Sequence, residues 1–171
     1  TNIATYIQNN IEIKKNLYLK VSLRSDQYRT VQNLSYSLIY DYDYDLWNNY
    51  GPLLFSQYDS NLSWNISLVY NKSSFSSFFI SHAKGFKTSG INQSHSFSNN
   101  RFYDTETSNN TEIGYKYSDN TVTLDFTSFY IDRNNPQLRL FMQLDLSNPL
   151  SFDYATFNGS HSYSSGMEVD L

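Results

Sequence analysis

The clearest structural signal in the chain is the stretch Leu17-Tyr18-Leu19-Lys20-Val21-Ser22-Leu23-Arg24. Apolar and polar side chains alternate in it, and the same period of two recurs in residues 62–70 and 122–130. In an extended strand, alternation puts the apolar side chains on one face and the polar ones on the other, whereas helical spacing would scatter them around a cylinder. The pattern therefore predicts β-strands with one apolar and one polar face.

The composition excludes several classes of protein. The 171 residues include 12 Lys and Arg against 16 Asp and Glu, which gives a formal net charge of -4. Because affinity for a phosphate backbone comes from clustered basic residues, this balance argues against nucleic-acid binding. The chain has no Cys, which excludes disulfides, Cys-ligated zinc and thiol catalysis. A chain of this length is expected to form one domain or one piece of a larger domain.

Aromatic residues are unusually frequent in the chain. They make up 18% of it, and charged residues make up 16%, against roughly 25% charged residues in a typical soluble domain. So many aromatic residues disfavour disorder, and the scarcity of Ala, Leu and Glu disfavours helix. No apolar run approaches the ~18 residues of a transmembrane helix. We therefore expect an all-β protein whose polar surface is largely uncharged.

The spacing of the alternating segments predicts an antiparallel β-meander. Seven strands are expected, near residues 3–13, 17–34, 55–70, 75–89, 104–117, 121–143 and 153–171. Short polar connections are expected at residues 14–16, 71–74 and 118–120, and long loops near residues 26–57, 90–103 and 144–152. Short and long connections alternate along the chain. That order places all short turns on one rim of the sheet and all long loops on the other.

Long alternating strands with this loop asymmetry are typical of an outer-membrane β-barrel, although a soluble β-sandwich also alternates. In a barrel, charged side chains belong in the lumen because charge on the lipid face costs ~2–4 kcal/mol near the midplane. Residues expected to face lipid are Leu17, Leu19, Val21, Leu23, Val122, Leu124 and Phe126. Residues expected to face the lumen are Lys20, Arg24, Thr123 and Asp125. Aromatic residues that fit interfacial girdles are Trp64, Tyr70, Tyr115, Tyr117 and Tyr130.

Four segments carry a family resemblance. They are Ser81-His82-Ala83-Lys84-Gly85-Phe86-Lys87-Thr88-Ser89-Gly90-Ile91-Asn92, Glu106-Thr107-Ser108-Asn109-Asn110-Thr111-Glu112-Ile113-Gly114-Tyr115-Lys116, Leu124-Asp125-Phe126-Thr127-Ser128-Phe129-Tyr130-Ile131-Asp132-Arg133 and Ser165-Gly166-Met167-Glu168-Val169-Asp170-Leu171. Their order and spacing resemble the barrel of TonB-dependent outer-membrane receptors. The resemblance covers at least residues 75–171, and residues 1–25 are similar to the strand that precedes them in the family. Lys84 replaces the family's usual Arg and Thr111 its usual Tyr, and both changes are conservative in role.

The resemblance implies a fold, a location and a function. Such receptors are plugged barrels of roughly 22 strands in the outer membrane of Gram-negative bacteria. They bind scarce ligands, most often a ferric siderophore or another iron complex, and import them with energy supplied by the TonB-ExbB-ExbD system through the plug. Neither an enzymatic activity, a cofactor nor a metal site is expected. A passive, porin-like barrel and a soluble β-sandwich adhesin or lectin are the alternative functions.

Residues 1–171 are expected to be a fragment of such a receptor barrel, without the plug domain and the C-terminal strands. Membrane barrels close completely, because unpaired strand edges are not tolerated in hydrocarbon. Seven strands are too few to enclose a plugged transport lumen. The isolated chain is therefore expected to form an open, curved sheet with unpaired edges at the strands near 3–13 and 153–171.

The first expected long loop contains candidate ligand-binding residues. Tyr and Asp alternate in residues 40–45, so an extended chain would have one aromatic and one carboxylate face. The candidates are Tyr42, Tyr44, Trp47 and Tyr50, although loops rich in Tyr, Asp and Asn are also ordinary in the extracellular part of barrels. His82, His95 and His161 are scattered, and no nucleophile motif of the G-x-S-x-G type accompanies them.

Overall fold

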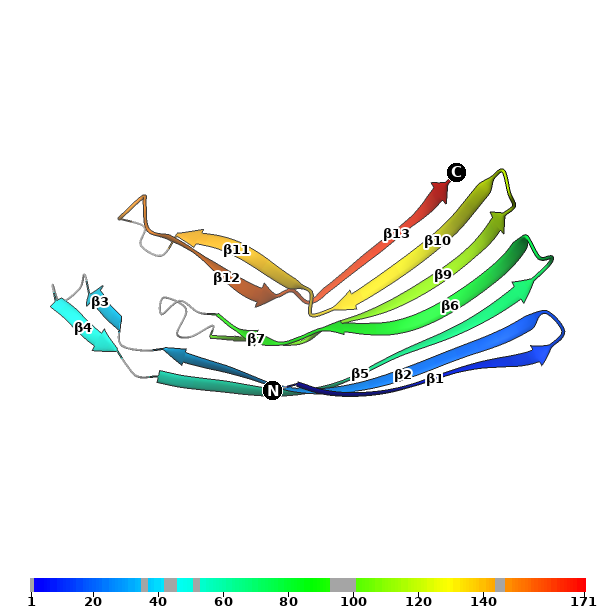
Figure 1. Ribbon diagram of the computed structural model, residues 1–171. Coiled ribbons are helices and arrows are strands. Elements are labelled where there is room, and N and C mark those ends of the chain that lie inside the picture. Colours follow the sequence, from blue (N-terminus) through cyan, green and yellow to red (C-terminus); the bar gives the residue numbers. More distant parts are fainter. Residues whose placement is uncertain (1, 35–36, 42–45, 51–52, 93–100, 144–146) are drawn as a thin grey trace.

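The computed structural model describes residues 2–34, 37–41, 46–50, 53–92, 101–143 and 147–171. Its main element is one seven-stranded antiparallel sheet whose spatial order follows the chain (Figure 1). This confirms the predicted all-β meander. The strands are β1 (Asn2–Lys14), β2 (Leu17–Leu34), β5 (Leu53–Asn71), β6 (Ser76–Lys87), β9 (Glu106–Ser118), β10 (Thr123–Asn134) and β13 (His161–Asp170).

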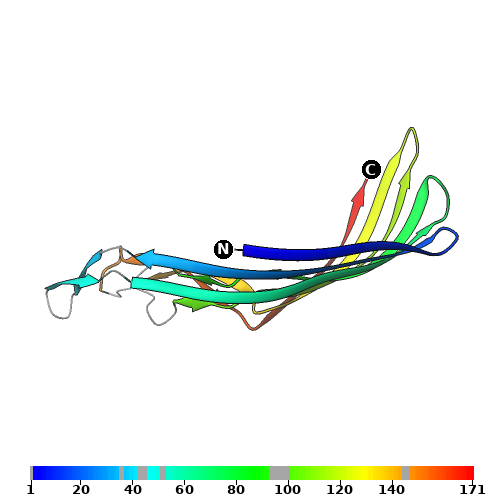
Figure 2. The ribbon, with the colours of Figure 1, turned by 60° about the horizontal axis from the view of Figure 1, so that its bottom comes forward.

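The sheet is open and strongly twisted. β1 and β13 lie at its two edges, and within the described residues no ladder joins them. Figure 2 shows β1, β2 and β5 running nearly level while β10 and β13 rise steeply at the same end of the sheet. No helix long and apolar enough to cross a bilayer occurs in the described part of the chain.

Three short connections lie together at one end of the sheet, as predicted (Figure 1). Each joins strands whose ladder continues to the turn, with Lys14 paired to Leu17 and Ser118 paired to Thr123. The first turn contains Asn16 at φ 67°. Asn tolerates this left-handed conformation better than most residues because its short side chain can hydrogen-bond locally.

At the other end, the stretch predicted as a long loop at residues 26–57 is largely strand, so that expectation was wrong, whereas residues 147–151 form turns, as expected for the loop at 144–152. Three two-stranded sheets extend beyond the main sheet: β3 (Ser37–Asp41) with β4 (Leu46–Tyr50), β7 (Gly90–Ile91) with β8 (Phe102–Tyr103), and β11 (Gln137–Gln143) with β12 (Phe152–Asn158). We call them the outer hairpins. β11 and β12 lie largely within the strands predicted at residues 121–143 and 153–171, whereas β3 and β4 lie in the stretch predicted as a loop, where apolar and polar residues do not alternate regularly.

The predicted strands at 121–143 and 153–171 are each broken once, at the same level of the sheet. Asn135 has φ 53° and precedes Pro136, which has no backbone N–H. Asn135 N still donates to Ser160 O at 3.3 Å, and Gly159 N donates to Pro136 O at 2.8 Å. The pairing therefore continues across a kink, and β11–β12 extends the β10–β13 hairpin in a new direction (Figure 1).

The strand register separates the two kinds of side chain onto opposite faces. One row across the sheet, on its first face, consists of Leu19, Leu68, Ile80, Ile113, Ser128 and Met167. The adjacent row lies on the opposite face and consists of Lys20, Ser67, Ser81, Glu112, Phe129 and Gly166. The residues predicted to face lipid share the first face, except Val122, which lies in the turn before β10. The residues predicted to face the lumen share the second.

The apolar face is exposed. Ile3, Ile66 and Ile80 are about half exposed or more, and Ala155 is the one buried hydrophobic residue in the described part of the chain. This reverses the arrangement of a soluble protein, in which large aliphatic side chains are buried. A soluble β-sandwich would cover this face with a second sheet, which the described residues do not supply.

Two glycines on the polar face lie beneath aromatic rings of the neighbouring strand. Gly114 of β9 is paired with Phe79 of β6, and Gly166 of β13 is paired with Phe129 of β10. A Cβ atom at Gly114 would overlap the Phe79 ring and would lie 2.6 Å from the backbone oxygen of Phe126. The rings therefore occupy the space that a side chain would need, and each covers the backbone of its neighbour.

Replacing Gly114 by Ala is expected to destabilise the sheet by about 1–3 kcal/mol, the usual cost of overpacking. The new methyl group must displace both the Phe79 ring and a backbone carbonyl. Gly85→Ala is the matched control, because its Cβ would meet only the flexible Ser108 hydroxyl at 3.2 Å. The midpoint of thermal unfolding in detergent measures the difference, and equal midpoints for the two variants would contradict the explanation.

The turn between β9 and β10 is held by Asp119. Its Oδ1 accepts hydrogen bonds from Thr121 N at 2.7 Å and Val122 N at 2.8 Å, and its Oδ2 accepts one from the Tyr117 hydroxyl at 2.7 Å. The Tyr117 hydrogen bond first, and then the two backbone hydrogen bonds, lower the pKa of Asp119 below its usual value. The ionised carboxylate is thus the form that stabilises this turn.

We expect the turn to weaken in acid. Because the pKa of Asp119 is lower in the folded state than in the unfolded state, its contribution is present above the unfolded pKa and is lost as pH falls through the folded pKa. Amide hydrogen exchange of Thr121 and Val122, corrected for intrinsic rates, should be unchanged down to about pH 4, the ordinary pKa of an Asp carboxyl, and should accelerate only below it. Asp119→Asn keeps a carbonyl oxygen for both amides and should lose this pH dependence. An unchanged profile in Asp119→Asn would contradict the assignment.

Candidate functional site

The polar face of the main sheet holds most of its charged side chains, and several are paired. Lys116 of β9 forms an ion pair with Asp125 of β10, and Arg133 Nε lies 3.8 Å from Glu106 Oε1. Asn110 donates a hydrogen bond to Glu112 at 2.6 Å. These contacts join neighbouring strands or neighbours along one strand. Several charges of the polar face are therefore compensated by partners within the sheet.

The tightest of these pairs lies within β2. Arg24 Nε and Nη2 donate to the two carboxylate oxygens of Asp26 at 2.8 and 2.7 Å. Residues two apart on a strand share a face, so the arginine side chain reaches its partner by lying along the strand. Asp26 is only 1% exposed, whereas the Arg24 side chain remains about half exposed. The guanidinium thus covers and neutralises a buried carboxylate with bidentate geometry.

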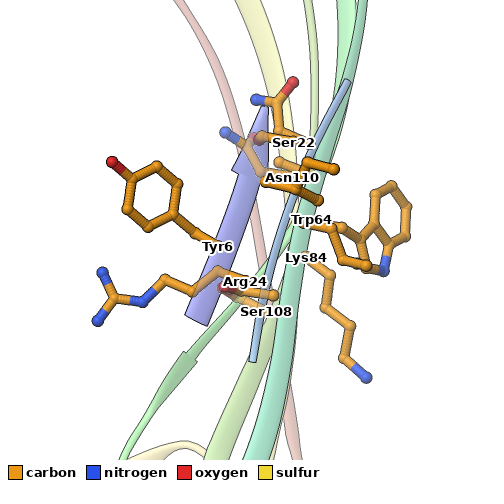
Figure 3. Close-up of a pocket in the computed structure, with 13 residues that line it drawn as sticks. Tyr6, Ser22, Arg24, Trp64, Lys84, Ser108 and Asn110 are labelled. Carbon is orange, nitrogen blue, oxygen red and sulfur yellow. The ribbon is translucent and has the colours of Figure 1, made fainter. Parts of the chain in front are cut away.

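Beside this pair lies an open hollow of about 540 Å³. Its floor consists of small residues on three adjacent strands, namely Ser63, Ala83, Gly85 and Ser108. Figure 3 shows Tyr6 and Arg24 extending to one side of the sheet and Trp64 and Lys84 to the other. Small uncharged side chains leave room against the backbone here, so the hollow can receive a side chain or a ligand group and offer it hydrogen bonds.

A second cluster lies on the outer hairpin β11–β12. The rings of Phe141 and Phe152 stack with centroids 4.5 Å apart at 12°, and Phe141 also contacts Tyr154 at 4.6 Å. The Arg139 guanidinium lies 4.9 Å from the Tyr154 ring centroid. All three rings are exposed. We call Arg139, Phe141, Phe152 and Tyr154 the aromatic cluster; exposed rings beside a cation can stack on flat ligand groups.

The structure describes only part of the predicted loop site. Tyr42 and Tyr44 lie outside the described residues. Trp47 and Tyr50 lie in β4, where Trp47 pairs with Tyr40 and Tyr50 with Ser37. The backbone of these two residues therefore belongs to a hairpin rather than to an irregular loop.

The histidines do not form one site. His82 Nδ1 lies 2.8 Å from the Thr111 hydroxyl, and its ring packs against Trp64 at a centroid distance of 5.2 Å. His161, on β13, lies 3.1 Å from an Asp132 carboxylate oxygen. His95 lies outside the described residues. Within the described part of the chain, no three His, Asp or Glu side chains come together as a metal-ligating group.

One exposed apolar face, one polar face with paired charges and an antiparallel meander of long strands together define a class of protein. It is the wall of a transmembrane β-barrel, in which lipid-facing and lumen-facing residues alternate along every strand. The family model described as TonB dependent receptor-like, beta-barrel matches residues 1–171. The chain belongs to the TonB-dependent receptor family.

Solved structures show the same fold. The ferric yersiniabactin uptake receptor FyuA from Yersinia pestis superposes with a TM-score of 0.72 at 18% identity, over 98% of this chain and 23% of that one. The ferric-catecholate import receptor Fiu from E. coli K12 gives 0.69 at 17% identity, over 98% and 24%. The copper transporter OprC gives 0.73 at 9% identity, over 98% and 26%. The chain thus spans about a quarter of each. Comparison with curated protein sequences finds no match.

The buried Asp26 carboxylate yields a test of the polar face. Arg24→Ala removes its guanidinium partner and should lower the unfolding midpoint, because a buried charge left unpaired is costly. Adding Asp26→Asn should restore much of the loss. Lys116→Ala is the control and should cost less, because its partner Asp125 is about one-third exposed and water can solvate it. A further loss of stability on adding Asp26→Asn would contradict the interpretation.

Proposed function

We propose that residues 1–171 form part of the barrel wall of an outer-membrane receptor in a Gram-negative bacterium. The receptor binds a scarce ligand outside the cell and imports it with energy from the TonB-ExbB-ExbD system. The observation that carries this proposal is the family match over the whole of residues 1–171. The protein performs no covalent chemistry and has no resident cofactor or metal.

The distribution of side chains supports an assignment of the two faces. The exposed apolar face meets lipid and the charged face meets the lumen, because a charge on the lipid face costs ~2–4 kcal/mol near the midplane. The apolar band runs obliquely across the strands. It extends to Leu62 on β5 but ends at Ile80 on β6, where His82 and Lys84 follow. An oblique band is what strands tilted by about 35–45° require.

The two ends of the sheet then have different surroundings. The three short turns lie at the periplasmic rim, and the outer hairpins extend into the external medium. The full receptor supplies the remaining strands, which pair with the edges at β1 and β13 and complete a barrel of roughly 22 strands around a plug. The hollow beside Arg24 lies on the lumen side in this arrangement and offers small, polar side chains to the plug or to a passing ligand.

The proposed ligand is a ferric siderophore or another iron complex. Two of the similar structures are receptors for ferric yersiniabactin and ferric catecholate. The outer hairpins carry the residues proposed to contact the ligand, because they lie at the rim where it arrives. These are Trp47 and Tyr50 of β4 and the aromatic cluster of β11–β12, and Tyr42 and Tyr44 are proposed with them from the sequence alone.

Uptake of iron tests the function directly. Iron-starved cells that express the full-length receptor as their one route for iron uptake are given radioactive iron as ferric complexes of catecholate, phenolate and hydroxamate siderophores. We expect uptake of one class, and we expect it to disappear when TonB is deleted. Uptake that persists without TonB would indicate passive conduction and would contradict the proposal.

Variants of the outer hairpins test the proposed contacts. Trp47→Ala and Tyr154→Ala should each raise the ligand concentration for half-maximal uptake by about tenfold, equivalent to ~1.4 kcal/mol of binding energy. Tyr163→Ala, an exposed aromatic residue on the apolar face of β13, is the control and should leave that concentration unchanged. Equal effects from all three variants would show that receptor folding, not ligand contact, had been altered.

A further inference from the structure

Beyond the main sheet, the outer hairpins β7–β8 and β11–β12 are not joined to each other by a backbone ladder. The pairing of β6 with β9 runs from Ser76 to Lys87, and β7–β8 then forms a sheet of its own. The pairing of β10 with β13 ends at Asn134, and β11–β12 forms another. Among the described residues no strand ladder links β7–β8 to β11–β12, although the two hairpins are adjacent in the meander. The relative position of the two hairpins therefore depends on contacts other than strand pairing.

The side chain of Asn158 bridges this gap at the level of the kinks. Its Oδ1 accepts a hydrogen bond from Asp104 N at 2.7 Å, and its Nδ2 donates to Asp104 O at 2.9 Å. The same Nδ2 donates to Asn135 O at 3.0 Å. A primary amide carries both a donor and an acceptor. Asn158 therefore reproduces with Asp104 the paired hydrogen bonds that two strand residues would exchange.

Asn92 makes the reciprocal contact further out, from the other hairpin. Its Nδ2 donates to Thr156 O at 2.9 Å, and its Oδ1 accepts from Thr156 N at 2.8 Å. Asn92 is itself fixed in place, because its backbone N donates to Arg101 O at 2.7 Å and its backbone O accepts from Arg101 Nη1 at 2.9 Å. Asn92 and Arg101 are both buried. The second bridge is thus shielded from water, in which an exposed hydrogen bond would be readily exchanged.

A third side chain strengthens the junction. Gln137 Nε2 donates to Thr88 O at 2.7 Å and to Asp104 O at 3.0 Å, and Gln137 N donates to Glu106 Oε2 at 2.8 Å. The backbone groups at the kink of one hairpin, which lack strand partners, are therefore satisfied by amides of the next hairpin. Backbone groups rarely remain unpaired in folded proteins, so these contacts explain how the sheet can splay here.

We propose that Asn92 and Asn158 are positioning residues that fasten β7–β8 to β11–β12, so that the two outer hairpins form one rigid surface. One bridge extends from Asn92 to Thr156 of β12, and the other extends from Asn158 of β12 to Asp104. The two points of attachment on β12 are therefore two residues apart. With a single bridge, one hairpin could rotate relative to the other about that contact, and the second bridge prevents this rotation. The aromatic cluster, whose Phe152 and Tyr154 lie on the same strand, is thereby held in one orientation. The inference concerns the hairpins alone and holds whatever ligand the receptor binds.

Distance measurements between the hairpins test this inference. Residues 1–171 contain no Cys, so nitroxide labels can be attached within them at Phe102→Cys on β8 and Leu150→Cys beyond β11 in the full-length receptor. Both positions are exposed. Pulsed electron resonance should give one narrow distance distribution for the labelled parent. Asn92→Leu and Asn158→Leu should each broaden it, and the double variant should broaden it most and move its mean.

Asn61→Leu is the matched control. The Asn61 amide donates to the Tyr28 hydroxyl at 3.3 Å, between β5 and β2, which a long ladder already joins. This variant should leave the distance distribution unchanged. An unchanged distribution in the double variant would overturn the proposal, and so would equal broadening in Asn61→Leu, which would mean that loss of any amide loosens the hairpins.

Hydrogen exchange of the unmodified receptor keeps the proposal testable if the double variant does not fold. Asp104 N and Thr156 N donate to side-chain amides rather than to a neighbouring strand. We expect both to exchange as slowly as amides within the β11–β12 ladder. Exchange as rapid as that of an unpaired turn amide would show that the bridges are open most of the time, and would overturn the proposal.

Discussion

In hydrocarbon, backbone amides and carbonyls have no water to bind, and each must find its partner within the sheet. The ladder that satisfies them also fixes which side chains share a face. Leu19, Leu68 and Ile80 fall in one row because the register of three strands requires it, and Lys20 lies opposite them for the same reason. A slip of one residue in any pair would move a charged side chain to the apolar face. The strand register that satisfies the backbone hydrogen bonds therefore also keeps the charged side chains off the apolar face.

The same condition explains how the structure changes beyond the kinks. In the proposed arrangement the strands enter water at this level and no longer need a continuous ladder, and the sheet divides into separate hairpins. Side-chain amides then replace some strand pairing, as Asn92 and Asn158 do with Thr156 and Asp104. A side-chain bridge is a local contact that one substitution can remove, whereas a ladder is shared among many residues.

The sequence predicts the wall well and the outer hairpins poorly, and the cause is physical. Alternation identifies β2, β5 and β10 because each has one apolar and one polar face. Residues 26–34 carry mostly polar side chains, so the sequence predicts them both as the end of the strand at 17–34 and as the start of the loop at 26–57, and in the structure they continue β2. The aromatic cluster escaped notice because Phe141 and Phe152 meet only through the β11–β12 register. Asn92 and Asn158 could not be recognised among so many asparagines, although Asn135-Pro136 and Gly159 did carry the signal for a kink.

The low charge content of the chain agrees with the role proposed for the polar face. Arg24 with Asp26, Lys116 with Asp125, and Arg133 with Glu106 are paired on that face, and the remaining surface is rich in Ser and Asn. Under the proposed function, such a wall offers hydrogen bonds to a passing ligand, and these three ion pairs do not hold an ionic ligand strongly at one point. An isolated lumenal charge would bind an oppositely charged ligand and slow its release. Under the proposed function, internal pairing of these charges leaves the strength and specificity of binding to the outer hairpins, where the exposed rings of Phe141, Phe152 and Tyr154 lie.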